Sequence, residues 1–369
     1  MDNEIGKKDI RITFHTYDFL GYFLPGAVFL SIIYVFKKLI EEFYKGPFPP
    51  FHYLISSFKS YFSGSNSHWA SEVVFLVLFI IFCYSLGHLI ASLSAFFLDR
   101  LLVGKCYKYP YVILFKIIGN SNSNSNNKLK RVLFFLVFVS NILFLINLFL
   151  FQKQLFFISL AVIVLLGIIS LSYINKIHVE EERGQNNKDN FLISFIIRIF
   201  DTKLIKKLGV IENVLKYSLN IYSTFDDNFI NKFKVAYKEV FDSDLEQDKV
   251  LVYWNCRNYI YQKGGALNEM LINWFNLYSY SRNLASSVYL SFIYILIIIF
   301  YQAFIIGDKN LITNFSTFSI HILSLKLFLS SLIIISVLFV LRYYYLYYIF
   351  YNKNLYRTFF YLYQQEKKK

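Results

Sequence analysis

The stretch VVFLVLFIIFCYSLGHLIASLSAFFL, from Val73 to Leu98, decides the fold class of this chain. Its 26 residues include no Asp, Glu, Lys or Arg. A helix needs about 20 apolar residues to cross the hydrocarbon core of a bilayer. The stretch therefore predicts a transmembrane helix.

The remaining chain repeats this pattern. Hydrophobic residues make up 56% of the sequence and charged residues 17%, with a mean hydropathy of +0.44, whereas soluble domains carry about a quarter charged residues. The abundance of Phe and Tyr beside few Pro is typical of a bacterial protein encoded by a low-GC genome. The pattern predicts an all-α integral membrane helical bundle with about six transmembrane helices and a cytoplasmic helical insert. The expected spans are Phe19–Phe36, Val73–Leu98, Val132–Phe151, Leu155–Ile174, Val288–Ile306 and Leu327–Tyr345.

The polar insert between the fourth and fifth spans covers residues 175–287. Apolar residues recur in it at helical spacing, as in Phe229, Phe233 and Val240, so helices are expected there. Gly264 and Gly265 predict the end of one helix. Ala266 then begins another that is expected to run through Arg282 into the fifth span. The predicted domains are therefore 1–174, 175–287 and 288–369.

The distribution of charge predicts the orientation. The chain has a formal net charge of +14, yet the insert between Lys176 and Arg282 holds 15 Lys or Arg against 14 Asp or Glu. The excess of basic residues lies beside the spans, including seven Lys or Arg against one acid between Asp99 and Arg131. The positive-inside rule then places both termini and the insert in the cytoplasm, with the spans in a bacterial inner membrane. Because the insert is nearly neutral, nucleic acid is not an expected partner.

Small residues and a proline mark two spans for close helix packing. Gly87, Ala91 and Ala95 recur at every fourth position of the second span, a spacing that lets helices approach closely in lipid. Pro25 and Gly26 lie inside the first span and are expected to kink it or to set its first turns.

His88 is a candidate functional residue because ionisable side chains within spans are costly. One interpretation is a relay for protons or substrate. The other is a neutral imidazole that bonds a hydroxyl such as that of Ser85 or Ser92, and this is favoured because no carboxylate accompanies it within the span.

The acidic run of the insert resembles a calcium loop only in its alternation. The glycine and the terminal bidentate Glu of an EF-hand are missing, so no metal is expected. Capping of the helix from Val250 to Tyr261 is favoured, and a nuclease-like carboxylate cluster is the alternative. The run consists of Asp242, Asp244, Glu246 and Asp248.

Two other features carry weaker signals. Cys83, Cys106 and Cys256 form no CxxC pair, so neither a disulfide framework nor structural zinc is expected. Aromatic residues alternate with Lys353 and Arg357 between Tyr343 and Tyr363, which favours an interfacial membrane helix over a platform for nucleic acid.

The run from Tyr17 to Gly26, YDFLGYFLPG, resembles the opening of uncharacterised bacterial inner-membrane proteins, some of which are encoded near phage-defence genes. A second similarity is Arg282-Asn283-Leu284, before the fifth span. The resemblance implies a role in antiviral defence and assigns no residue roles. Asp18, Pro25, Gly26 and Arg282 join His88 as candidate functional residues.

The architecture favours an effector or anchor subunit that receives a signal through the insert and acts in the membrane. A small-solute transporter or channel is the alternative, and a membrane enzyme using the acidic run is a third class. No catalytic residue or cofactor is predicted. The expected partners are the lipid bilayer, further copies of the chain, and a cytoplasmic protein bound by residues 175–287.

Overall fold

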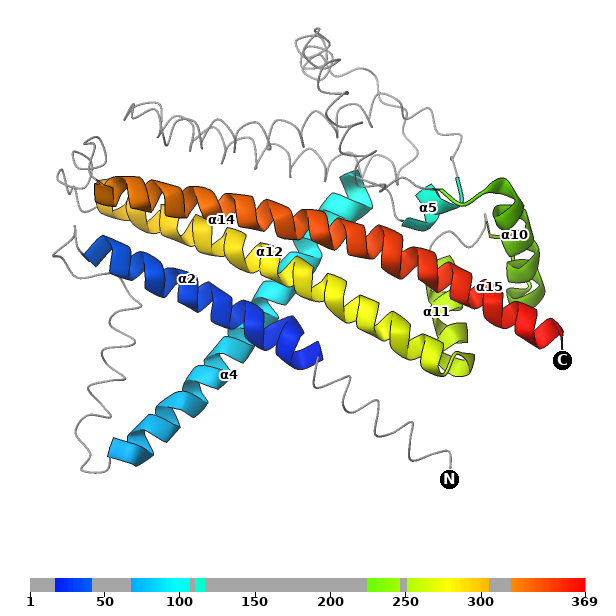
Figure 1. The fold of residues 1–369 in the computed structure, drawn as a ribbon, viewed down its shortest axis with the longest axis horizontal. Helices are drawn as coiled ribbons and strands as arrows, with labels where there is room; N and C mark the ends of the chain where they lie inside the picture. Colours follow the sequence, from blue (N-terminus) through cyan, green and yellow to red (C-terminus); the bar gives the residue numbers. More distant parts are fainter. Residues whose placement is uncertain are drawn as a thin grey trace, which may run out of the picture. The chain divides into compact units, whose positions relative to one another are not determined.

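A computed structural model of the chain describes residues 17–41, 68–106, 110–116, 224–245, 251–304 and 320–368. Within these ranges every regular element is a helix, so the all-α prediction is confirmed for them (Figure 1). The chain forms two compact units. Unit 1 comprises residues 1–97, 148–153 and 276–343, and unit 2 comprises residues 98–147, 154–275 and 344–369.

Four helices of the described ranges are long and apolar enough to cross a membrane. They are Phe19–Ile40, Leu76–Arg100, Ala266–Ile299 and Leu323–Lys367. These helices overlap the predicted first, second, fifth and sixth spans. The predicted spans 132–151 and 155–174 lie outside the described residues, so the count of six rests on the sequence.

Apolar side chains remain exposed along two of these helices, α4 (His68–Ser94) and α14 (Ile320–Tyr345). Leu76 is 59% exposed, Leu89 58% and Leu338 59%. A helix that is apolar all round belongs either in the core of a large protein or in a bilayer. Because these side chains are not covered by protein, lipid is the medium that suits them.

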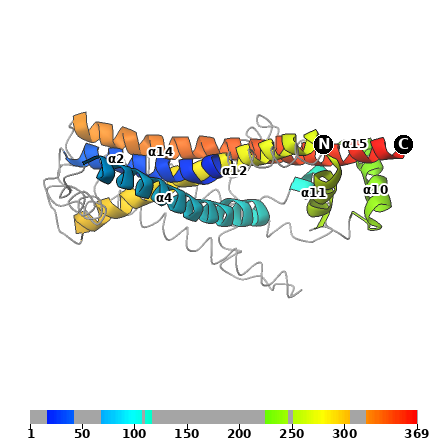
Figure 2. The ribbon, with the colours of Figure 1, turned by 90° about the horizontal axis from the view of Figure 1, so that it is seen from below.

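Two helix pairings are found among the residues of unit 1 that the structure describes. The π-helix η1 (Phe19–Phe23) continues directly into α2 (Leu24–Glu41), and together they cross α4 (Figure 1). The helices α12 (Ala266–Phe304) and α14 run alongside one another (Figures 1 and 2). The hydroxyl of Ser336 on α14 donates to the carbonyl of Ala285 on α12 at 3.0 Å.

The helix α12 extends without interruption over 39 residues, which confirms the predicted continuity into the fifth span. It follows α11 (Leu251–Lys263) after a turn at Gly264 and Gly265. Gly265 has φ +46°, a left-handed conformation that residues with a side chain rarely adopt. The first ten residues of α12 belong to unit 2 and the others to unit 1.

Aromatic side chains form the core of unit 2. The described helices of unit 2 include α5 (Pro110–Leu114), α10 (Asp227–Phe241), α11, η3 (Leu346–Asn352) and α15 (Lys353–Lys367). Burial of one large apolar side chain contributes about 1.5–3 kcal/mol to stability, relative to leaving it exposed to water. Side chains that are 3% exposed or less include Phe115, Phe233, Tyr237, Tyr356 and Phe359.

The C-terminal tail is part of this core. The sequence pattern predicts an interfacial membrane helix between Tyr343 and Tyr363, but the structure packs α15 against α10 and α11. The ring of Phe359 lies 5.3 Å from that of Phe233 and 5.1 Å from that of Tyr259. The aromatic residues of the tail therefore serve protein packing, and residues 344–369 belong to unit 2.

Two carboxylates connect the end of α15 to α10 and α11. Glu239 of α10 accepts from the Tyr363 hydroxyl and from Lys367 Nζ, and these bonds hold the pKa of Glu239 below its ordinary value. Glu366 of α15 accepts from Tyr259 Oη at 2.6 Å and from Lys263 Nζ at 2.5 Å. An exposed ion pair typically contributes less than about 1 kcal/mol to stability. The bonds of Glu239 and Glu366 therefore orient α15, while the aromatic core stabilises it.

Candidate functional site

The candidate site is the crossing of η1 and α2 with α4, where two glycines bring backbones into contact. A Cβ atom at Gly26 would lie 1.9 Å from the carbonyl oxygen of Cys83. One at Gly87 would lie 1.7 Å from the carbonyl oxygen of Tyr22. No side chain fits at either position, so both glycines are required by the spacing of the helices.

The remaining members of the small-residue pattern have other surroundings. Ala91 is 7% exposed and Ala95 is half-buried at the start of η2 (Ala95–Cys106). Both alanines already carry a Cβ atom. Of the three small residues, Gly87 is therefore the one at which the backbones of the two helices come closest.

Pro25 changes the hydrogen bonding of the first span. A proline has no N–H, so the carbonyl of Gly21, four residues earlier, loses its usual helical donor. The chain before it adopts a wider turn, in which the N–H of Leu24 donates to the carbonyl of Phe19. A carbonyl freed in this way within lipid needs a partner from another helix.

Asn283 of α12 supplies that partner. Its Nδ2 donates to the Gly21 carbonyl at 2.7 Å, across 262 positions of the sequence. Its Oδ1 accepts from Ser94 Oγ at 2.5 Å and from Arg282 Nε at 3.2 Å. The side chain is fully buried. Asn283 therefore joins α12 to both η1 and α4.

A second hydrogen bond between α12 and the first span lies one turn further along α12. Ser287 Oγ donates to the carbonyl of Pro25 at 2.7 Å, and Ser287 is fully buried. By contrast, Ser291 donates to the carbonyl of Ser287 within its own helix. We define the polar junction as Gly21, Pro25, Ser94, Asn283 and Ser287.

His88 lies beside this junction, and its ring packs against aromatic side chains. The ring stacks on Tyr22 with a centroid separation of 3.8 Å and meets the edge of Tyr84 at 4.6 Å. The hydroxyl of Ser92 donates to the backbone carbonyl of His88 rather than to the ring. The His88 side chain is exposed in this chain.

Arg282 and Asp18 bring opposite charges to the same region. Arg282 is 8% exposed, and the hydroxyl of Tyr22 is within electrostatic range of both charges. Tyr22 Oη donates to Tyr17 Oη at 3.3 Å. The two stretches singled out by resemblance, 17–26 and 282–284, thus meet in unit 1.

The acidic run lies apart, in unit 2. Asp242 ends α10 in a left-handed conformation with φ +50°, and Asp244 pairs with Lys238 at 3.0 Å. Glu246 and Asp248 lie outside the described residues, so their capping of the following helix stays a prediction. Among the described residues no group of three His, Cys, Asp or Glu side chains is placed to hold a metal ion.

The polar junction is suited to holding helices together. Its amides, hydroxyls and carbonyls bond one another, and the guanidinium of Arg282 adds a bond to Asn283 Oδ1. Buried networks of this kind specify one arrangement of helices and are costly when partly broken. The junction can therefore fix the position of α12 relative to α4 and to the helix formed by η1 and α2.

Sequence reasoning selected only Pro25 of the polar junction as a site residue and missed Gly21, Ser94, Asn283 and Ser287. A usable signal was present: Pro25 frees the carbonyl four residues before it, and that carbonyl requires a donor. The sequence does not identify the donor among the many Asn and Ser residues of the chain.

Comparisons of the chain with protein-family models, with curated proteins and with solved structures give no match.

Proposed function

We propose that the chain is a multi-pass membrane effector or anchor subunit of the bacterial inner membrane, in which unit 2 receives a signal and unit 1 responds. In this proposal several copies assemble in the bilayer. A role in phage defence follows from the resemblance of residues 17–26 and 282–284.

The observation that carries the proposal is the continuity of α12. One helix begins in unit 2, where its residue Leu271 is 5% exposed, and continues to Asn283 in the polar junction. A helix can transmit displacement along its axis because each backbone N–H is hydrogen-bonded to the carbonyl four residues earlier. A change at the beginning of α12 then acts on the bonds that Asn283 and Ser287 make.

The contacts of unit 2 support the predicted orientation. Phe115, from the segment after the second span, packs against Phe233 of α10 at 4.6 Å and against Tyr356 of α15 at 5.1 Å. In the sequence, Phe115 follows the second predicted span, Phe233 precedes the fifth, and Tyr356 follows the sixth. Segments that form one core lie on one side of a membrane, and the positive-inside rule makes that side the cytoplasm.

A cysteine at Val235 tests the orientation. Val235 is 56% exposed on α10, whereas Cys256 is fully buried and burial raises the pKa of its thiol well above the ordinary value. In a Cys106→Ser background we expect Val235→Cys to resist a membrane-impermeant maleimide in intact cells and to react after permeabilisation. Reaction of equal extent in intact cells would reverse the orientation.

A proline at Ser279 tests the coupling through α12. The substitution removes a backbone hydrogen bond and costs about 3 kcal/mol or more of helix stability. We expect overexpression of the natural chain to slow growth and to admit an impermeant DNA dye, and we expect Ser279→Pro to reduce dye uptake at least roughly tenfold if α12 must be rigid.

Ser279→Ala is the matched control, since Ser279 Oγ is buried and lacks a hydrogen-bond partner. This variant should permeabilise cells like the natural chain. Both variants should be recovered from washed membranes in equal amounts. If Ser279→Pro remained as active as Ser279→Ala, transmission through α12 would be refuted, and dye exclusion by the natural chain would contradict the effector role.

Transport of a small solute is the second candidate, because the first span is broken at Pro25 and His88 lies beside the break. Broken helices in transporters expose carbonyls that coordinate ions. Here the carbonyl of Gly21 accepts the Asn283 amide, and that of Pro25 accepts the Ser287 hydroxyl. These occupied carbonyls favour the effector. Solute uptake that disappears in His88→Ala would favour the transporter instead.

A further inference from the structure

The lipid-facing side of α14 ends in a cation. Leu327 and Ile334 are each 54% exposed and Leu338 is 59% exposed, and their helical spacing places them on one face. The same spacing continues to Arg342, which is exposed, and to Tyr345, which is 39% exposed. This face of α14 therefore passes from apolar side chains to a guanidinium group and then to a phenol ring.

The position of Arg342 along α14 matches the edge of a bilayer. The candidate span begins at Leu323, and a helix rises about 1.5 Å per residue, so Arg342 lies about 28 Å further along the axis. The hydrocarbon core of a bilayer is about 30 Å thick. When this core covers the apolar residues after Leu323, the long side chain of Arg342 reaches the level of the lipid phosphates.

No other described residue engages the guanidinium group of Arg342 directly. Among the described residues Arg342 forms no hydrogen bond, ion pair or aromatic contact. The hydroxyl of Tyr280 on α12 lies within electrostatic range of it. An exposed cation at this depth is therefore available to an anion from the membrane.

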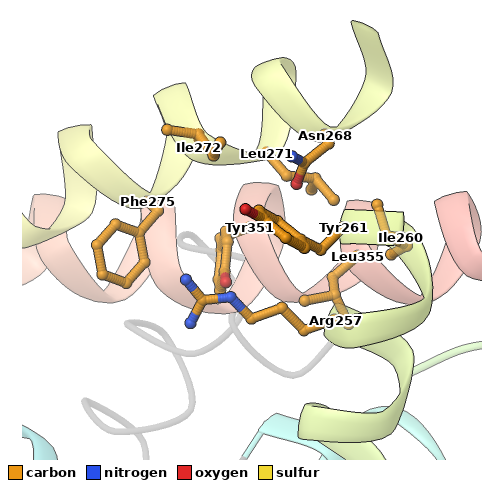
Figure 3. A pocket seen from close by; sticks show the side chains of 9 residues that line it. All are labelled: Arg257, Ile260, Tyr261, Asn268, Leu271, Ile272, Phe275, Tyr351 and Leu355. Atoms are coloured by element: carbon orange, nitrogen blue, oxygen red, sulfur yellow. The ribbon is translucent and has the colours of Figure 1, made fainter. Parts of the chain in front are cut away.

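Two arginines of unit 2 differ in this respect. Arg257 lies in the wall of a cavity of about 100 Å³ (Figure 3), and its guanidinium carbon is 5.2 Å from the ring centre of Phe275. The guanidinium carbon of Arg357 is 6.0 Å from the ring centre of Phe225. Both arginines are engaged by aromatic rings of the protein.

The charges near Arg342 select the kind of lipid. Neither α14 nor residues 276–304 of α12 include an Asp or Glu. A phospholipid phosphate can accept two N–H groups of one guanidinium, which makes a strong charge-assisted pair. Phosphatidylethanolamine would also bring an ammonium group, for which these two helical segments offer no carboxylate. Phosphatidylglycerol has the phosphate without the ammonium group.

We propose that Arg342 binds the phosphate of phosphatidylglycerol, with an acyl chain along Ile334 and Leu338 and the Tyr345 ring at the level of the headgroup. The binding site itself depends on the lipid exposure of α14. Its place in the cytoplasmic leaflet rests on the proposed function, because it uses the proposed orientation, which the Val235→Cys experiment tests separately.

Lipid binding to the purified full-length chain in detergent tests the site. Native mass spectrometry counts the lipids that remain on the protein as dioleoylphosphatidylglycerol is added. We expect the first lipid to bind the natural chain saturably and to bind Arg342→Gln at least roughly tenfold more weakly, because hydrogen bonds between two charged groups are lost. Arg342→Lys keeps the charge but not the paired N–H groups, so its affinity should be intermediate.

Arg357→Gln is the matched control. Arg357 is also exposed, but it lies about 22 Å further along the run of helix than Arg342, which is more than a Debye length of about 10 Å. This variant should bind phosphatidylglycerol like the natural chain. Helix content identifies any variant that fails to fold, and if Arg342→Gln is one, the comparison of Arg342→Lys with the natural chain decides.

Three results would overturn the proposal. The first is equal affinity of the natural chain and the folded Arg342 variants, or an equal loss in Arg357→Gln. The second is binding of dioleoylphosphatidylethanolamine as tight as that of dioleoylphosphatidylglycerol. The third is displacement of the lipid by glycerol 3-phosphate, which would indicate a site for a soluble phosphate. None of these measurements depends on orientation or membrane permeabilisation, so they are distinguishable from failure of the proposed function.

Discussion

Gly87→Ala is expected to destabilise unit 1 by about 3 kcal/mol or more, although alanine normally improves a helix by about 1 kcal/mol over glycine. The reason is the position of the added carbon, 1.7 Å from the carbonyl oxygen and 2.5 Å from the carbonyl carbon of Tyr22. Both are backbone atoms, which cannot rotate away as a side chain does. The two helices must separate to admit the methyl group.

Unfolding in mixed micelles of mild and denaturing detergent measures this effect, with helix content as the signal. Gly26→Ala should behave like Gly87→Ala because its added carbon would lie 1.9 Å from the carbonyl oxygen of Cys83. Gly21→Ala is the matched control, since its nearest neighbour is the Tyr17 ring at an ordinary 3.5 Å. Equal stability of Gly87→Ala and Gly21→Ala would refute the close approach.

The elements that local physics determines were predictable from the sequence. A run such as Val73–Leu98 is helical because lipid offers no partner for backbone polar groups. Gly264 and Gly265 mark a helix boundary because glycine adopts the left-handed conformation at low cost. The continuity of α12 follows likewise, since no helix-breaking residue lies between Ala266 and Phe304.

The composition of unit 2 was not predictable in the same way. Leu355, Tyr356 and Phe359 have a helical spacing that suits a membrane surface and a protein core equally well. Only the presence of α10 and α11 beside them decides between the two, and that is a property of tertiary contacts. The same holds for Phe115, which packs on residues more than a hundred positions away.

For the polar junction, too, one part can be read from neighbouring residues and another depends on residues far away in the sequence. The need for a donor at the Gly21 carbonyl is local, because Pro25 is fixed in the sequence. The identity of the donor is distant, because Asn283 lies 262 positions away. The resemblance singled out both stretches without indicating that they touch.

Asn283→Leu is expected to destabilise unit 1 by about 2–4 kcal/mol, since it removes three hydrogen bonds from a fully buried position. Double-mutant cycles in a membrane protein give about 0.6 kcal/mol per interhelical bond on average, and an unsatisfied buried group costs about 1–3 kcal/mol. Leucine has a similar size, so lost bonding rather than a cavity accounts for the change. The measurement is again unfolding in mixed micelles.

Ser287→Ala and Ser291→Ala form a matched pair for the second bond. Both substitutions remove one buried hydroxyl from α12, but only Ser287 bonds another helix, through the carbonyl of Pro25. We expect Ser287→Ala to cost more than Ser291→Ala by about 1 kcal/mol. Equal costs would mean that the contact with Pro25 contributes nothing to helix association.

A double-mutant cycle with Pro25→Ala tests why Asn283 is needed. Alanine restores an N–H at position 25, which can donate to the carbonyl of Gly21 in place of the Asn283 amide. In the Pro25→Ala background, Asn283→Leu should therefore cost about 1 kcal/mol less than in the natural chain. An identical cost in both backgrounds would show that Asn283 stabilises the junction through Ser94 and Arg282 alone, and that the proline creates no demand for it.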